Sequence, residues 1–106
     1  GHHAGRDFLG GFCYFNNIAI AVESALKQTD KIAIIDIDGH HGNGTQDIFS
    51  GRKDILFVSL HQKNAFPLSG FVSEQNCLNY PLLPTTDGKT YMKIFADALE
   101  RVFEKR

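Results

Sequence analysis

An α/β fold with a largely parallel sheet is predicted from two apolar runs and from the helical patterns that alternate with them. Residues 31–38 and 55–60 are apolar with hardly any alternation, which is typical of strands covered on both faces. Apolar residues recur at helical spacing over 16–28 and again after Pro84. With 106 residues, the chain is long enough for one domain with a core that needs no disulfide.

The first half of the chain predicts a helix, a strand, a short helix and a second strand. Asn16 or Asn17 can cap the helix over 16–28. The strand over 31–38 leads into a glycine-rich turn at 39–44, after which Thr45 can cap a short helix. The face of the first helix consists of Ile18, Ala21, Val22, Ala25 and Leu26.

The second half predicts a long loop, a strand and a final helix. Residues 61–77 contain proline and glycine without any period, so they form the loop. A short strand is expected over about 78–82. The apolar face of the final helix consists of Tyr91, Ile94, Phe95, Ala98, Leu99 and Val102.

The charge balance argues against nucleic-acid and membrane-surface partners. Eleven Lys and Arg residues face twelve Asp and Glu residues, for a formal charge of −1, and neither sign forms a block. The longest apolar run is too short to span a membrane. Cys13 and Cys77 have no Cys-x-x-Cys spacing, which favours free thiols and an intracellular, cytoplasmic setting.

The chemistry-bearing segment lies where the first strand ends, which is where open α/β sheets bind ligands. The period of a strand places Asp36, Asp38 and His40 on one face. Two carboxylates buried together need a cation or a proton, and an aspartate with a histidine fits a zinc site.

Simpler interpretations of the same residues remain open at this point. The aspartates can cap the turn, with His40 and His41 on the surface. The glycines of 39–44 can instead form a phosphate-binding turn, although no Walker lysine follows and the carboxylates would repel a phosphate. The pair His2 and His3 can be the remnant of a purification tag.

Four segments together resemble the zinc-dependent histone deacetylase and acetylpolyamine amidohydrolase superfamily. In order they are Gly-His-His-Ala at 1–4, Gly-Phe-Cys-Tyr-Phe-Asn-Asn at 11–17, Asp-Ile-Asp-Gly-His-His-Gly-Asn-Gly-Thr at 36–45 and Val-Ser-Leu-His at 58–61. The resemblance implies a three-layer arginase/deacetylase-like fold, present only in part. The chain 1–106 is then a single partial catalytic domain whose core motifs lie in 1–61.

The resemblance assigns Asp38 and His40 as two of three zinc ligands. His3 matches the general base that later protonates the leaving amine, and His2 matches its electrostatic or proton-sharing partner.

By the same match, Asp36 orients His2 and Asn43 orients His3, as side chains that fix the ring of a histidine do. Asparagine at position 43 points to the class II-like branch of the family.

Further positions match the substrate channel and two monovalent cation sites. Gly11, Phe12 and Phe66 match the walls of an acyl-lysine tunnel. A structural K⁺ or Na⁺ would use Asp36, Asp38, His40, Ser59 and Leu60. A second, more peripheral cation would use backbone oxygens of Phe49, Arg52 and Ile55.

The third zinc ligand and the transition-state tyrosine of the family have no match over 62–106, where Asp87, Asp97, Tyr80 and Tyr91 are expected to be structural. We therefore expect weak zinc binding, little hydrolysis by this chain alone, and self-association through truncated surfaces. The implied substrate is an acetylated lysine, a polyamine or a small acetylated amine. The alternatives are a non-catalytic remnant that binds an acyl ligand or a partner, and a nucleotide-binding module.

Overall fold

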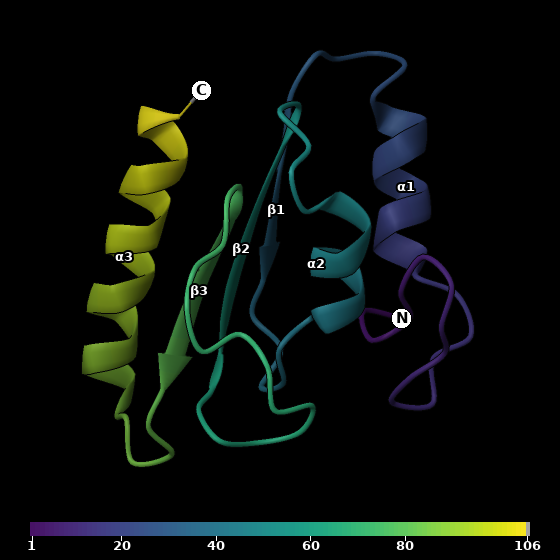
Figure 1. The fold of residues 1–106 in the computed structure, drawn as a ribbon. Helices are drawn as coiled ribbons and strands as arrows, with labels where there is room; N and C mark the ends of the chain where they lie inside the picture. The colour runs from purple at the N-terminus through teal and green to yellow at the C-terminus, as the bar shows by residue number, and fades with distance from the viewer. Residues whose placement is uncertain (106) are drawn as a thin grey trace.

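Three parallel strands form one sheet, in the order β1-β2-β3, in the computed structural model, which describes residues 1–105 (Figure 1). The helix α3 lies on one side of the sheet, and α1 and α2 lie on the other (Figure 1). The predicted α/β fold with a parallel sheet is therefore confirmed. The elements are α1 (Asn17–Ala25), β1 (Ile32–Asp36), α2 (Asn43–Phe49), β2 (Ile55–Gln62), β3 (Cys77–Leu82) and α3 (Gly88–Glu104).

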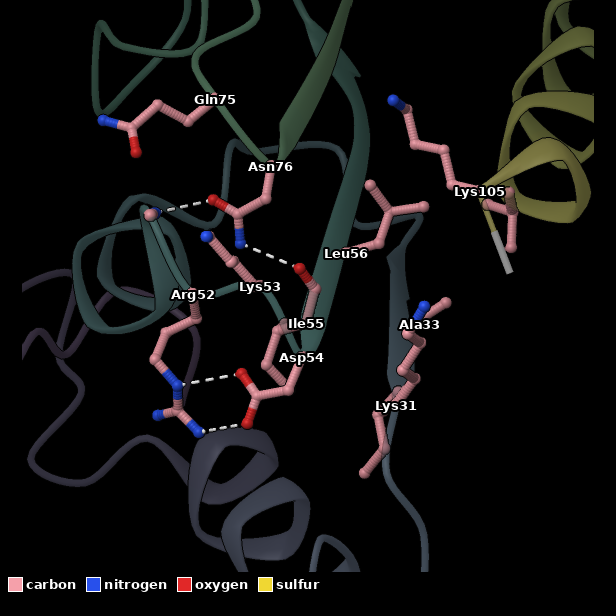
Figure 2. Close-up of a pocket in the computed structure, with 13 residues that line it drawn as sticks. Lys31, Ala33, Arg52, Lys53, Asp54, Ile55, Leu56, Gln75, Asn76 and Lys105 are labelled. Atoms are coloured by element: carbon pink, nitrogen blue, oxygen red, sulfur yellow. Dashed lines mark hydrogen bonds and ion pairs between the residues drawn. The ribbon is translucent and has the colours of Figure 1, made fainter.

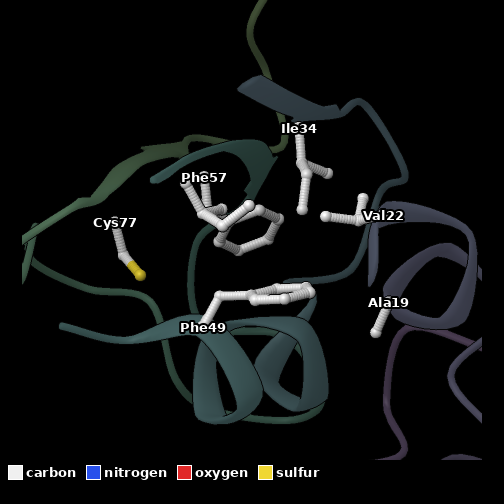
Figure 3. Packing of buried hydrophobic residues seen from close by; sticks show 7 residues of the cluster. Ala19, Val22, Ile34, Phe49, Phe57 and Cys77 are labelled. Atoms are coloured by element: carbon white, nitrogen blue, oxygen red, sulfur yellow. The ribbon is translucent and has the colours of Figure 1, made fainter. Parts of the chain in front are cut away.

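The central strand β2 is the only one of the three with a neighbour on each side, and it contributes side chains to both halves of the core. Phe57 points toward α1 and α2, where Phe49 and Val22 pack against it (Figure 3). Val58 points the other way and packs with Ala98 of α3. The prediction of a strand covered on both faces is confirmed for β2, whose residues 57, 58 and 60 are at most 1% exposed.

The same prediction is wrong for β1. Ile34 is buried, but its neighbour Ile35 is 39% exposed, and Ile37 just beyond the strand is 64% exposed. The reason is that β1 pairs only with β2 and lies at the edge of the sheet, and α3 packs over β2 and β3. One face of β1 is therefore covered and the other is open.

Two helix starts show how local chemistry sets the boundaries. Asn16 caps α1 because its Oδ1 accepts a hydrogen bond from the backbone N–H of Ala19 at 3.0 Å. Asp87 caps α3 in the same way, through the N–H of Thr90 at 2.8 Å. The first helix ends at Ala25, three residues before its predicted end.

Thr45 does not cap α2, contrary to the prediction. The helix starts at Asn43, three residues before the start that a Thr45 cap would give, and Gly42 precedes it without a side-chain cap. Thr45 is buried in the first turn, where its Oγ1 accepts a hydrogen bond from Nδ2 of Asn16 at 3.0 Å. The hydroxyl thus links α2 to the start of α1.

The remaining boundaries follow from strand pairing. β1 spans 32–36 rather than 31–38, whereas β2 extends to Gln62 because it pairs with β3 as far as Leu82. A long loop without a helix or strand of its own joins β2 to β3, as predicted. Tyr80 of β3 and Tyr91 of α3 pack against the core between these two elements and β2. Within residues 1–105, no helix is long and apolar enough to cross a membrane.

Candidate active site

The amino-terminal segment and the start of α2 meet at the carboxyl end of β1. The backbone N–H groups of Gly44 and Thr45 donate to the carbonyl oxygen of His2 at 3.0 and 3.3 Å. The first N–H groups of a helix lack partners within the helix, so this carbonyl satisfies two of them. A Cβ on Gly44 would lie 2.2 Å from the carbonyl oxygen of Ala4, so the close approach requires glycine.

The side chain of His2 is held by Asp36, the last residue of β1. Nδ1 of His2 donates to Oδ2 of Asp36 over 2.6 Å. This hydrogen bond outweighs burial and raises the pKa of His2 above its ordinary value. Burial opposes the charge on Asp36, but the bonds from His2 and from the N–H of Asp38 lower the pKa of the carboxyl. The pair therefore favours an imidazolium beside a carboxylate.

His3 is held by a neutral group instead. Its Nδ1 lies 2.7 Å from Oδ1 of Asn43. A carboxamide oxygen only accepts, so Nδ1 carries the proton and Nε2 is left as the free nitrogen. The rings of His2 and His3 lie 4.2 Å apart between centroids, and the His3 side chain is buried.

Asp38 and His40 lie in the turn beyond β1, each with a side chain that is about half exposed. Oδ1 of Asp38 lies 3.7 Å from Nδ1 of His40 and 3.7 Å from Nε2 of His2. The His40 ring is 6.2 Å from the ring of His3. The two histidines and the two predicted zinc ligands therefore converge on one place.

The convergence does not come from strand alternation, which was the predicted cause. The strand ends at Asp36, whose Oδ1 accepts the N–H of Asp38 at 3.0 Å. Asp38 in turn accepts the N–H of His40 at 2.9 Å. Two successive side-chain-to-backbone turns thus place the three residues, because aspartate readily bonds the backbone two residues on.

Asp38 and His40 offer the oxygen and nitrogen donors that suit zinc. Within residues 1–105, no group of three His, Cys, Asp or Glu side chains is close enough to hold a metal ion. The donor set therefore fits two positions of a zinc site, and two protein ligands alone make a weak one.

The residues predicted for a structural K⁺ or Na⁺ are neighbours across two strands and a turn. Asp36 is in register with Ser59 on β2. Beyond them, the N–H of Gln62 donates to the carbonyl oxygen of Gly39 at 2.9 Å. This bond holds the turn that contains Asp38 and His40 against the end of β2. Leu60 lies two residues before Gln62 on the same strand. Ser59 is fully buried, and its Oγ lies 2.8 Å from Nδ1 of His61.

Two of the three predicted channel residues contact the site. The ring of Phe66 stands edge-on to His3, at 5.1 Å between centroids, and 6.2 Å from His40. Gly11 packs so tightly on the His3 ring that a Cβ there would lie 2.3 Å from Cδ2 of His3. Phe12, at a φ of 64°, is fully exposed, so its ring projects into solvent.

A buried network behind the site was missed by sequence reasoning. His41, treated above as a surface residue in one interpretation, is only 2% exposed. Its Nδ1 accepts from Ser69 at 2.7 Å, and its Nε2 donates to Gln46 at 3.0 Å. Burial, reinforced by His61, lowers the pKa of His41 to about 4, so the ring is neutral at physiological pH.

His61 completes the network from β2. Its Nε2 donates to the carbonyl of Gly70 at 2.9 Å, and burial lowers the pKa of His61 as well. A Cβ on Gly70 would lie 2.6 Å from both His41 and His61. The network thus ties the loop that carries Phe66 to α2 and β2. No local sequence signal distinguishes these buried histidines from exposed ones.

The chain is similar to known amidohydrolases over nearly its whole length. The histone deacetylase domain model matches residues 1–105. Acetylpolyamine amidohydrolase 2 of Pseudomonas aeruginosa is 40% identical over 96% of this chain and 33% of its own length. The acetylpolyamine amidohydrolase of Mycoplana ramosa is 43% identical, with the same coverage. The chain spans about a third of the length of these relatives.

Solved structures show the same likeness in three dimensions. The acetylpolyamine aminohydrolase of Burkholderia pseudomallei superposes with a TM-score of 0.92 at 35% identity, covering 99% of this chain and 34% of that one. The HD domain of HDA15 gives a TM-score of 0.71 at 39% identity, covering 76% of this chain and 27% of that one.

Proposed function

Because this chain belongs to the histone deacetylase domain family, we propose that it supplies the two histidines and two zinc ligands of a deacetylase site completed by other residues. The reaction is hydrolysis of the amide that joins an acetyl group to a lysine-like amine or a polyamine. The observation that carries the proposal is the pair of bonds from His2 to Asp36 and from His3 to Asn43, placed beside Asp38 and His40.

In this proposal Asp38 and His40 hold zinc. The chemistry that zinc supplies in such a site is Lewis acidity toward the amide carbonyl and toward a water molecule. Both side chains are half exposed and face the histidine pair, so a substrate carbonyl can approach between them.

His3 is the proposed general base. Asn43 holds the proton on Nδ1, so Nε2 can take a proton from the attacking water and pass it to the leaving amine. Phe66 and Gly11 also contact the His3 ring, and these contacts help to fix the orientation of the ring.

His2 is the proposed electrostatic partner. The carboxylate of Asp36 favours its protonated form, and a positive charge next to His3 stabilises the oxyanion that develops during attack on an amide. Asp36 therefore acts through His2 as a positioning residue.

The aromatic ring of Phe66 suits an extended aliphatic amine, because it can bury methylene groups while the acetyl end reaches the histidines. The named relatives are acetylpolyamine amidohydrolases, which makes a small acetylated amine the substrate class to test first. An acetyl-lysine peptide is the second.

The test is acetate release from an acetylpolyamine and from an acetyl-lysine peptide by zinc-loaded protein that carries this segment. His3→Ala should lower kcat by about 10²–10⁴-fold. The exposed residue Asp97 on α3 provides a matched control, since Asp97→Ala should leave kcat unchanged. Turnover that survives His3→Ala would contradict the assigned base, and hydroxamate binding without any turnover would favour the non-catalytic alternative.

A further inference from the structure

The segment that joins α2 to β2 differs from what the family resemblance implies. A peripheral monovalent cation there would need the backbone oxygens of Phe49, Arg52 and Ile55. In the structure, Nδ2 of Asn76 donates to the carbonyl oxygen of Phe49 at 2.9 Å and to that of Ile55 at 2.9 Å. The carboxamide nitrogen of Asn76 therefore lies between two of the oxygens that the cation would need.

The orientation of the Asn76 side chain is fixed by its partners. Its Oδ1 accepts the N–H of Gly51 at 2.7 Å, so the oxygen faces a donor and the nitrogen faces two acceptors (Figure 2). The carbonyl oxygen of Phe49 also accepts a hydrogen bond from the backbone N–H of Arg52 at 3.0 Å. This second bond occupies the remaining lone pair of that oxygen. Turning the carboxamide over would break all three side-chain bonds.

The charge around this place also disfavours a cation. The adjoining cavity, of about 520 Å³, is lined by Lys31, Lys53 and Lys105 together with Arg52. The carboxylate of Asp54 lines it too, but both of its oxygens bond Arg52, at 2.9 and 2.8 Å. A bound monovalent cation would be repelled by this excess of positive charge.

We infer that the carboxamide of Asn76 takes the place of a monovalent cation, and that residues 49–76 form no peripheral cation site. The carboxamide nitrogen of Asn76 bonds the carbonyl oxygens of Phe49 and Ile55 and so links the end of α2 to the start of β2. Its Oδ1 accepts the N–H of Gly51 and so holds the turn between them. This inference is independent of the proposed hydrolysis. It implies that K⁺ and Na⁺ do not stabilise this part of the chain.

The first test is nuclear magnetic resonance of the 106-residue chain, in choline chloride and in KCl at equal ionic strength. The side-chain NH₂ signals of Asn76 and the backbone amide of Gly51 should stay in place. Amides around Asp38, in the other cation site of the resemblance, serve as the internal comparison. A saturable shift of the Asn76 and Gly51 signals with K⁺ would overturn the inference.

The second test is thermal unfolding in choline chloride. Asn76→Ala removes three hydrogen bonds and should lower Tm by roughly 5–10 °C. Asn17 is exposed on the first turn of α1, so Asn17→Ala is the matched control and should leave Tm nearly unchanged. An Asn76→Ala chain as stable as the native one would overturn the inference. The magnetic resonance comparison needs no variant, so it decides the question even if Asn76→Ala does not fold.

Discussion

The two histidines of the candidate site differ in the side chain that holds each ring. His2 bonds a carboxylate, which favours a charged imidazolium. His3 bonds a carboxamide, which fixes the proton on Nδ1 without adding a charge. This difference is the physical reason for assigning the proton transfer to His3 and the electrostatic role to His2.

Replacing the carboxylate tests this division. In the metal-free chain, Asp36→Asn should lower the pKa of His2, because the negatively charged hydrogen-bond partner that raises it is removed. A titration of the ring by nuclear magnetic resonance measures it. Asp97→Asn makes the same change on the exposed face of α3 and should not move the His2 titration.

The same shift predicts the pH dependence of stability. The pKa of folded His2 is raised, so the His2–Asp36 pair stabilises the fold fully below the ordinary pKa of histidine. That contribution is lost as the pH rises through the raised value. The difference in free energy of unfolding between native chain and Asp36→Asn should therefore narrow with rising pH, and a widening difference would contradict the assignment.

At the scale of elements, α2 is the part that assembles the site. Its first N–H groups bond the carbonyl of His2, and its first residue, Asn43, bonds the ring of His3. The amino-terminal segment is thus docked through the start of one short helix. The tight approach at Gly44 makes that docking possible.

Two glycine-to-alanine substitutions distinguish the effect of this docking on stability from the effect of helix propensity. Gly44→Ala should destabilise the fold by about 2–4 kcal/mol, because the new Cβ would collide with the backbone of Ala4 and His3. Gly88→Ala, at the start of α3, meets open space and should stabilise the helix by up to about 1 kcal/mol. Urea unfolding measures both, and equal effects would mean that the segment 1–5 is not docked as described.

Apolar patterns, turn residues and capping residues together predicted the existence and type of the six elements, and the errors in the prediction have physical causes. The hydroxyl of Thr45 accepts a hydrogen bond from the side chain of Asn16 and does not cap the helix α2. β1 has the apolar pattern of a buried strand, but the strand residues that pack with Ala98 of α3 come from β2 and β3, and Ile35 of β1 is 39% exposed. Which strand lies at the edge of a sheet depends on pairing between distant segments, and a local pattern carries no information about it.

At the scale of the molecule, apolar side chains lie exposed on several segments of residues 1–105, and two of these segments bear on association. The edge strand β1 and the turn after it expose Ile35 and Ile37. The loop before α1 exposes a larger group, consisting of Leu9, Phe12, Tyr14 and Phe15. Exposed apolar patches and open strand edges favour association.

We therefore predict that the chain self-associates. Light scattering should show an average mass that rises with concentration above the 11.8 kDa of one chain. Ile37→Lys places a charge beside the open edge and should reduce the association. A monodisperse monomer at high concentration would contradict the prediction.

The roles proposed for the site residues depend on the family resemblance, whereas composition and spacing left several interpretations open. The spacing of Asp36, Asp38 and His40 suggested a metal site but gave the wrong local geometry. The buried network of His41 and His61 had no local signal, because their burial depends on the loop that folds back over them. Whether such residues are buried depends on packing between distant segments of the chain.

The most direct test of the central claim, that Asp38 and His40 form part of a zinc site, is a calorimetric zinc titration of the 106-residue chain at neutral pH. We predict weak one-to-one binding that Asp38→Ala and His40→Ala each weaken at least about tenfold. The control Asp97→Ala should bind as the native chain does. Zinc binding of equal strength in all four proteins would show that these two residues are not ligands.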